Sequence, residues 1–255
     1  MIGVFDSGFG GLTVLNRILE KVDTPFIYFG DTAHLPYGTK SKDAVRRFSM
    51  KILEFLLKKN VDIVVVACST ASSFALNDLR KKSKVPVIGM IEPVVERVKK
   101  EGFKRIGIIG TPGTINSGAY SESIKKEVSD VKILNKKTPL FVPLVEEGLT
   151  DGKITESIVK MYLNGFKNKI DALVLGCTHY PLLKRVIKRI LPKVILIDPG
   201  EEVADFIKRN FSEVLKNKNR KSIFYVSDDP EKFKKYGRRF FHREIKEVKL
   251  SKCTE

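Results

Sequence analysis

One pattern occurs twice in the chain, in Val61-Asp-Ile-Val-Val-Val-Ala-Cys68-Ser69-Thr70 and in Ile170-Asp-Ala-Leu-Val-Leu-Gly-Cys177-Thr178-His179. Each copy is an uninterrupted apolar run that ends in cysteine. A second pair, Ile2-Gly-Val-Phe-Asp6-Ser7 and Ile106-Gly-Ile-Ile-Gly110-Thr111, repeats in the same order at nearly the same offset. Continuous apolar runs of this kind are typical of parallel strands that helices cover on both faces. The sequence therefore predicts two related α/β units.

The rest of the chain follows the same alternation of short Val/Ile/Phe-rich runs and segments of helical period. We expect two doubly wound α/β domains with mainly parallel sheets. The clearest helix signal spans Ser41 to Lys59, where apolar residues recur at helical spacing behind a serine cap. The expected strands are Ile2 to Phe5, Phe26 to Phe29, Asp62 to Ala67, Pro86 to Ile88, Arg105 to Ile109, Val131 to Leu134, Ala172 to Gly176, Val194 to Ile197 and Ser222 to Val226.

The composition is that of an ordinary globular protein. The chain has 255 residues, of which 42% are hydrophobic and 30% charged, so disordered, collagen-like and disulfide-scaffold classes are excluded. No apolar stretch approaches the roughly 20 residues that a membrane span needs. The chain opens directly into Ile2-Gly3-Val4-Phe5, without a basic region or a small-residue cleavage site. We expect an unexported, cytoplasmic protein that does not bind a membrane.

The residues that bind metals and cofactors are sparse. The cysteines and histidines are Cys68, Cys177, Cys253, His34, His179 and His242. An odd number of cysteines suits a reducing compartment, and only Cys177-x-His179 has a close ligand spacing, so we expect no metal. Gly8-Phe-Gly-Gly11 lacks the full dinucleotide motif, and no motif singles out a lysine for pyridoxal phosphate. We expect no cofactor.

The positive charge is the main opening for a different class of function. Lys plus Arg number 47 against 30 Asp plus Glu, a net charge of +17. Much of it lies after Lys208, in runs such as Lys216-Asn-Lys-Asn-Arg-Lys221 and Lys232-Phe-Lys-Lys235, which could follow a phosphate backbone. No nucleic-acid-binding motif interrupts these runs. A solvated lysine-rich face is the preferred interpretation, with nucleic-acid binding at most weak and nonspecific.

The paired cysteines indicate acid/base chemistry. Ligands of open α/β sheets bind beyond the carboxyl ends of the strands, where Cys68 and Cys177 lie. At the start of a helix we expect the pKa of such a thiol to fall. Two thiols in facing units can approach one carbon from opposite sides, so that one removes a proton and the other delivers one. Asp6 ends the first expected strand, beside where a doubly wound sheet would place Cys68, and His179 lies two residues beyond Cys177, so both could assist. The alternative is that the cysteines close core strands, Asp6 is a helix cap and His179 is packed.

Five segments occur in one order along the chain: Phe5-Asp-Ser-Gly-Phe-Gly-Gly-Leu12, Gly30-Asp-Thr-Ala-His-Leu-Pro-Tyr-Gly38, Cys68-Ser-Thr-Ala-Ser72, Pro143-Leu-Val-Glu-Glu-Gly148 and Leu175-Gly-Cys-Thr-His-Tyr-Pro181. Together they resemble the signature motifs of the glutamate racemases, which belong to the cofactor-independent aspartate/glutamate racemases. The resemblance spans most of the chain and thins after about Asn210. It implies two pseudosymmetric domains that hold the amino acid between two cysteines.

The resemblance also implies boundaries and roles. The first domain would comprise residues 1–97 and 208–255, and the second residues 98–207. Cys68 would act on D-glutamate and Cys177 on L-glutamate, with assistance from Asp6, Glu146 and His179. The substrate-binding residues would be Asp6, Ser7, Tyr37, Gly38, Ser69, Thr70, Thr178 and His179, with Thr111 and Thr114 as further candidates.

One position departs from the family pattern. The family usually has Asn where this chain has Ser69, so a side-chain amide is replaced by a hydroxyl with fewer hydrogen-bonding groups. This change leaves a racemase of aspartate or another small acidic amino acid as the nearest alternative. The resemblance further implies a homodimer that supplies D-glutamate for peptidoglycan.

Overall fold

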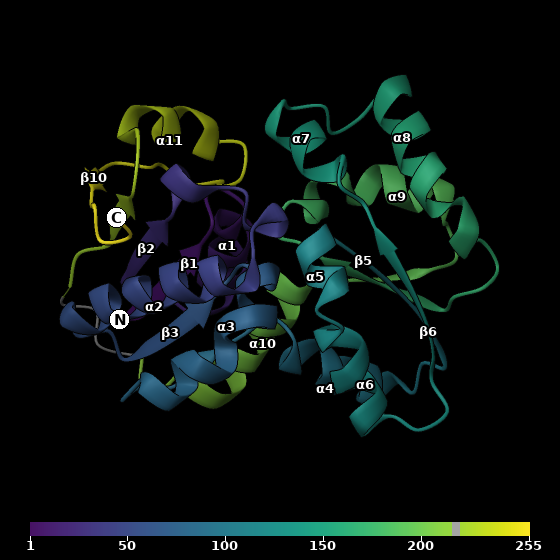
Figure 1. The fold of residues 1–255 in the computed structure, drawn as a ribbon, viewed down its shortest axis with the longest axis horizontal. Coiled ribbons are helices and arrows are strands. Elements are labelled where there is room, and N and C mark those ends of the chain that lie inside the picture. The colour runs from purple at the N-terminus through teal and green to yellow at the C-terminus, as the bar shows by residue number, and fades with distance from the viewer. Residues whose placement is uncertain (216–219) are drawn as a thin grey trace.

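The computed structural model describes residues 1–215 and 220–255. Figure 1 shows two lobes, each built on its own sheet. The first sheet has the strand order β10-β9-β2-β1-β3-β4 and the second β6-β5-β7-β8. All pairings are parallel. The predicted α/β class with parallel sheets is therefore confirmed.

The strands of the first sheet are β1 (Ile2–Asp6), β2 (Phe26–Gly30), β3 (Ile63–Val66), β4 (Val87–Ile88), β9 (Ile223–Val226) and β10 (Val248–Leu250). Those of the second sheet are β5 (Arg105–Gly110), β6 (Lys132–Lys137), β7 (Ala172–Gly176) and β8 (Ile195–Ile197). The α-helices are α1 (Gly11–Lys21), α2 (Lys42–Lys58), α3 (Ser69–Lys82), α4 (Glu92–Glu101), α5 (Pro112–Asn116), α6 (Ala119–Glu127), α7 (Phe141–Glu146), α8 (Lys153–Leu163), α9 (Lys184–Ile190), α10 (Pro199–Phe211) and α11 (Pro230–Gly237). Four 3-10 turns complete the list: η1 (Thr32–His34), η2 (Tyr37–Thr39), η3 (Asn164–Phe166) and η4 (Tyr180–Leu183).

The internal repeat corresponds to equivalent strands of the two sheets. In the first sheet β1 lies between β2 and β3, and in the second β5 lies between β6 and β7. All residues of β3 and β7 are buried, as expected for central strands that helices cover on both faces. Cys68 lies two residues after β3 and Cys177 directly follows β7, so each sheet presents its cysteine at its carboxyl edge.

Every predicted strand is present, with ends that shift by a few residues. Helix α2 begins after Ser41, whose side chain accepts a hydrogen bond from the Ala44 N–H, as the cap signal predicted. Strand β6 runs further than expected, into an exposed lysine-rich stretch. Strand β10 was missed, because it is a short, largely exposed edge strand without an apolar run.

The two sheets divide the strands as the predicted domains require. The predicted break points, at 97/98 and 207/208, fall inside α4 and α10, and α10 packs against both α1 and α4. The division at those residues stays a prediction. Among the helices that the structure describes, none is long and apolar enough to cross a membrane.

The basic runs near the end of the chain do not form one described patch. Lys216 and Lys218 lie outside the described residues. Arg220 precedes β9 and donates to the Asn60 carbonyl, whereas the run from Lys232 lies on α11 after β9. Arg220 and the run from Lys232 therefore lie at opposite ends of β9, which favours the solvated-face interpretation for the described residues.

Candidate active site

A cavity lies where the carboxyl edges of the two sheets meet. Its empty space, counted with the part that is open to solvent, is about 410 Å³. Among the predicted site residues, its walls include Ser7, Tyr37, Gly38, Cys68, Ser69, Thr70, Thr111, Glu146, Cys177, Thr178 and His179. The predicted residues are thus brought together from both sheets, except Asp6 and Thr114. The sequence reasoning did not assign Phe9, Leu35, Pro36 or Val142 to the wall, although the first three lie within the quoted motifs and Val142 directly precedes one.

Cys68 is a buried thiol at the N-cap of α3. Its Sγ donates to the Ser7 Oγ at 3.9 Å. Burial, and after it the nearby charge of Asp6, raises the pKa of Cys68 to about 12, and the hydrogen bonds with the Ala71 N–H and Ser7 offset only part of this effect. The expectation that the helix start lowers this pKa is wrong, because desolvation of the thiolate outweighs the N–H groups. The structure holds Cys68 as a thiol.

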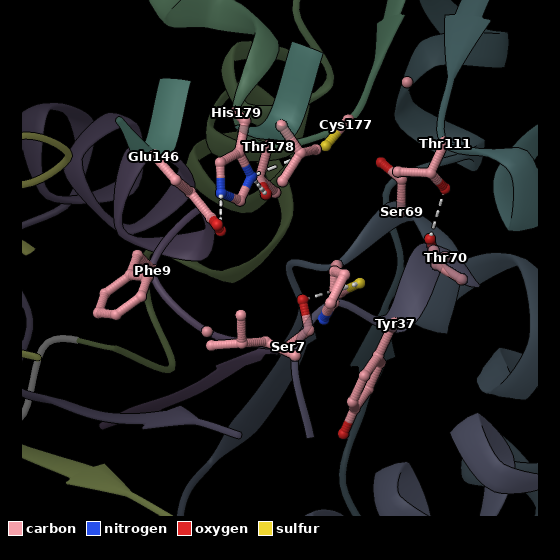
Figure 2. A pocket seen from close by; sticks show the side chains of 17 residues that line it. Ser7, Phe9, Tyr37, Ser69, Thr70, Thr111, Glu146, Cys177, Thr178 and His179 are labelled. Carbon is pink, nitrogen blue, oxygen red and sulfur yellow. Dashed lines mark hydrogen bonds and ion pairs between the residues drawn. The ribbon is translucent and has the colours of Figure 1, made fainter. Parts of the chain in front are cut away.

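Cys177 belongs to a chain of polar contacts on the opposite wall. Its Sγ lies 3.8 Å from His179 Nδ1, and His179 Nε2 lies 3.1 Å from Glu146 Oε1 (Figure 2). Burial by itself lowers the pKa of His179, but the hydrogen bonds to Cys177 and Glu146 more than reverse this and raise it to about 10. His179 is therefore an imidazolium that donates to both neighbours. This places a cation beside the Cys177 sulfur.

Asp6 lies behind the cavity wall. It is fully buried, and its Oδ2 accepts a hydrogen bond from the Gly8 N–H at 2.9 Å. Burial raises the pKa of Asp6, and the positive charge of His179 and the surrounding N–H groups reduce this effect. Asp6 does not line the cavity, so the structure does not show the direct contact with the substrate that the sequence predicts. Asp6 instead acts on Cys68 through its charge.

Tyr37 lines the cavity, but its side chain is engaged elsewhere. Its ring points away from Cys177 (Figure 2), and its hydroxyl donates to Asp31 Oδ2 at 2.6 Å. The hydroxyl is therefore not available to a substrate. The residue lines the cavity beside Gly38, where a Cβ would lie only 2.5 Å from the Thr111 Cβ. Only glycine permits this close approach of η2 to the second sheet.

Three threonines join the two lobes beside Cys68. The Oγ1 atoms of Thr70, Thr111 and Thr114 lie 3.0 Å from one another. Thr114 does not line the cavity, so its place is to support the other two. Ser69 Oγ lies 3.4 Å from the Tyr120 hydroxyl, a second contact between α3 and the second lobe.

The match to known proteins covers the whole site. The family model for Asp/Glu/Hydantoin racemase matches residues 2–207. The glutamate racemase of Aquifex pyrophilus is 52% identical over 222 residues, covering 84% of this chain and 86% of that protein. That of Geobacter metallireducens is 44% identical over 259 residues, covering 97% and 94%. The chain belongs to the Asp/Glu/hydantoin racemase family. It is therefore an isomerase.

Solved structures agree with the family. The glutamate racemase of Francisella tularensis in complex with D-glutamate superimposes with a TM-score of 0.92 at 38% identity, covering 99% of this chain and 97% of that one. The Thermus thermophilus enzyme in complex with β-chloro-D-alanine gives 0.89 at 42% identity, covering 98% and 96%. The aspartate racemase of Picrophilus torridus, at 19% identity and a TM-score of 0.62, shares the fold.

In this racemase the start of α1 is fitted tightly under His179. A Cβ on Gly10 would lie 2.1 Å from the Thr178 Oγ1 and 2.6 Å from the His179 Nδ1. The Thr13 hydroxyl donates to the Thr178 carbonyl at 2.9 Å. Gly10 therefore allows the first lobe to fix the loop that carries Cys177.

The described residues offer little to a metal ion. Within 1–215 and 220–255, no group of three or more His, Cys, Asp or Glu side chains is placed to hold one. The polar groups of the cavity are instead hydroxyls, thiols and the His179–Glu146 pair, a set that suits an amino acid with ionised carboxylates.

Proposed function

We propose that the enzyme interconverts L-glutamate and D-glutamate by proton transfer between two cysteines, without a cofactor. One observation carries the proposal: Cys68 and Cys177, from equivalent strand ends of two sheets, line the same cavity. The family membership and the relatives' names support glutamate as the substrate.

In the L-to-D direction, the Cys177 thiolate removes the α-proton and the Cys68 thiol delivers a proton to the opposite face. The electron pair of the C–H bond passes to the α-carbon and then to the new C–H bond. Glu146 helps to keep His179 positively charged, and the His179 cation pairs with the thiolate before the transfer, while the raised pKa of Cys68 keeps its proton available. In the D-to-L direction the cysteines exchange roles. Protonation of Asp6 then favours the Cys68 thiolate, because the Asp6 charge opposes it.

Hydroxyls and N–H groups would bind the two carboxylates and the ammonium group. The hydroxyls of Ser7, Ser69, Thr70 and Thr178 line the cavity. At the start of η2, the first N–H groups, from Tyr37 on, have no carbonyl partner within the turn. We assign substrate binding to these hydroxyls and to the main chain at Tyr37 and Gly38.

The decisive experiment follows the α-proton in heavy water. Purified enzyme, dialysed against a metal chelator, should racemise glutamate without additives. Cys177→Ser should not invert either enantiomer, but should still exchange the α-proton of D-glutamate for deuterium through Cys68. Cys68→Ser should show the reverse preference. Cys253→Ser, outside the cavity, is the matched control and should behave as the wild type.

Three outcomes contradict this account. Equal, mild effects of both cysteine variants would place the cysteines in core packing. Activity lost on dialysis and restored by pyridoxal phosphate or a metal would remove the cofactor-independent mechanism. A preference of the wild type for aspartate would reassign the substrate and leave the two-cysteine mechanism in place.

We also propose that the enzyme acts in the cytoplasm as a homodimer that supplies D-glutamate for peptidoglycan. The family resemblance supports the pathway, and free thiols as catalysts suit a reducing compartment. Helix α8 supports a self-association surface, because Ile154 and Met161 are 65% and 59% exposed on it. Light scattering of the purified enzyme tests the dimer, and a monomer at micromolar concentration would exclude it.

A further inference from the structure

Asp31 is the centre of a buried hydrogen-bond network beside the cavity. It follows β2 and is fully buried. Its Oδ2 accepts from the Tyr37 hydroxyl at 2.6 Å. Its Oδ1 accepts from His34 Nδ1 at 2.9 Å and from the Thr254 hydroxyl at 2.9 Å. One buried carboxyl group thus joins the loop of the cavity wall to the end of the chain.

The end of the chain is held in place for this contact. Thr254 is only 2% exposed. Before it, β10 pairs with β9, and the Ser251 N–H donates to the Val226 carbonyl at 2.8 Å. After it, the Lys51 ammonium donates to the Glu255 carbonyl. In Figure 1 the C-terminus lies beside β10 at the edge of the first sheet. The Thr254 hydroxyl is therefore presented to Asp31 by an ordered segment.

The same network reaches the cavity through Tyr37. Tyr37 is 1% exposed, so its neighbours confine its ring, and the hydrogen bond to Asp31 anchors its hydroxyl. The next residue, Gly38, lines the cavity and lies against Thr111 of the second lobe. A small displacement of Tyr37 would therefore change both the wall of the cavity and the contact between the lobes.

We propose that Thr254 is a positioning residue of the active site. Its hydroxyl fixes the Asp31 carboxyl group, which holds the Tyr37 ring and so sets the Tyr37–Gly38 wall against the substrate. The proposal rests on the proposed glutamate racemase activity for its kinetic test. It concerns a residue outside the matched region 2–207.

The first test compares two substitutions at Thr254. Thr254→Val keeps the shape and removes a donor to the buried Asp31 carboxyl group, so KM for glutamate should rise about 5- to 20-fold while kcat changes less than about twofold. Thr254→Ser keeps the donor and should stay within about twofold of the wild type in both constants. Cys253→Ser, the adjacent residue, is the matched control and should leave KM unchanged.

A double-mutant cycle tests the route. Tyr37→Phe removes the other hydroxyl on Asp31 and should raise KM in the same way. If Thr254 acts through Tyr37, Thr254→Val should add little in the Tyr37→Phe background. Effects on KM that multiply in the double variant would overturn the proposed route.

A third measurement needs no activity. Hydrogen exchange followed by mass spectrometry should show faster exchange in the peptide covering residues 31–40 of Thr254→Val, where the Lys40 N–H bonds the Tyr37 carbonyl. Faster exchange spread evenly over the chain, or unchanged exchange with unchanged KM, would overturn the positioning role. A wild-type enzyme that fails to racemise glutamate would refute the proposed function, while this peptide would still report on Thr254.

Discussion

The substitution Glu146→Gln tests what holds the charge of His179. The two side chains are joined by a 3.1 Å contact, and the pKa of His179 is raised to about 10 from its ordinary 6.5. Gln keeps the shape and an acceptor oxygen but removes the negative charge. Because an adjacent opposite charge shifts a pKa by about 1–3 units, the pKa of His179 should fall to about 7–9.

The loss of this proton removes the cation that stabilises the Cys177 thiolate. If the pKa of His179 falls to about 8, only about a tenth of the variant keeps the imidazolium at pH 9, so kcat/KM should drop about tenfold there. The loss should be smaller near pH 7. It should be equal for both enantiomers, because they have the same free energy and the ratio of the two kcat/KM values is therefore fixed.

The assay is a profile of kcat/KM against pH from about 6 to 10.5, followed by circular dichroism of glutamate. The basic limb should move down by about 1–3 pH units in Glu146→Gln. Glu147→Gln is the matched control, because Glu147 is the adjacent residue, is exposed and does not line the cavity. A variant whose basic limb and rate match the wild type would refute the role of the Glu146 charge.

Three further predictions follow from the same contacts. The raised pKa of His179 contributes stability that is complete below about pH 6.5 and is lost as pH rises through about 10. The melting temperature of Glu146→Gln should therefore fall furthest below that of the wild type near pH 6.5, and the difference should disappear by pH 10.5. A difference that stays constant with pH would contradict this. Ser69→Asn should lower KM for glutamate with little change in kcat, because the longer amide can reach both the cavity and the Tyr120 hydroxyl; a raised KM would indicate a pocket rebuilt around serine. Retention on DNA should disappear at physiological salt, and tight, sequence-selective binding would require a second function.

The sequence was sufficient for the features that depend on local pattern. Strands β3 and β7 are fully buried, and their continuous apolar runs identify them as buried strands in the sequence. A cysteine that follows such a run must lie at the edge of the sheet where the parallel strands end. The placement of both cysteines at one cavity follows from these two facts once the sheets face each other.

The sequence was insufficient where the neighbours are distant in the chain. The start of α3 offers Cys68 local N–H groups, but burial and the charge of Asp6, 62 residues earlier in the chain, set its pKa. The motif places Tyr37 at the site but does not show where its hydroxyl bonds: its partner Asp31 is also bonded by Thr254, 223 residues further along the chain. No local pattern carries such information.

The C-terminal segment shows why the motifs thin before the chain ends. The Phe240 ring packs against His179 with its centroid 5.2 Å away, and its carbonyl accepts from Asn16. The neighbouring Arg239 donates to the Glu146 carbonyl. These contacts support the Glu146–His179 pair: the Phe240 ring packs on His179, and Arg239 bonds a main-chain oxygen. Many different side chains could make such contacts, whereas the proposed proton transfer requires a thiol at one position. Support by shape therefore leaves a weaker signature than chemistry, although both hold the same cavity.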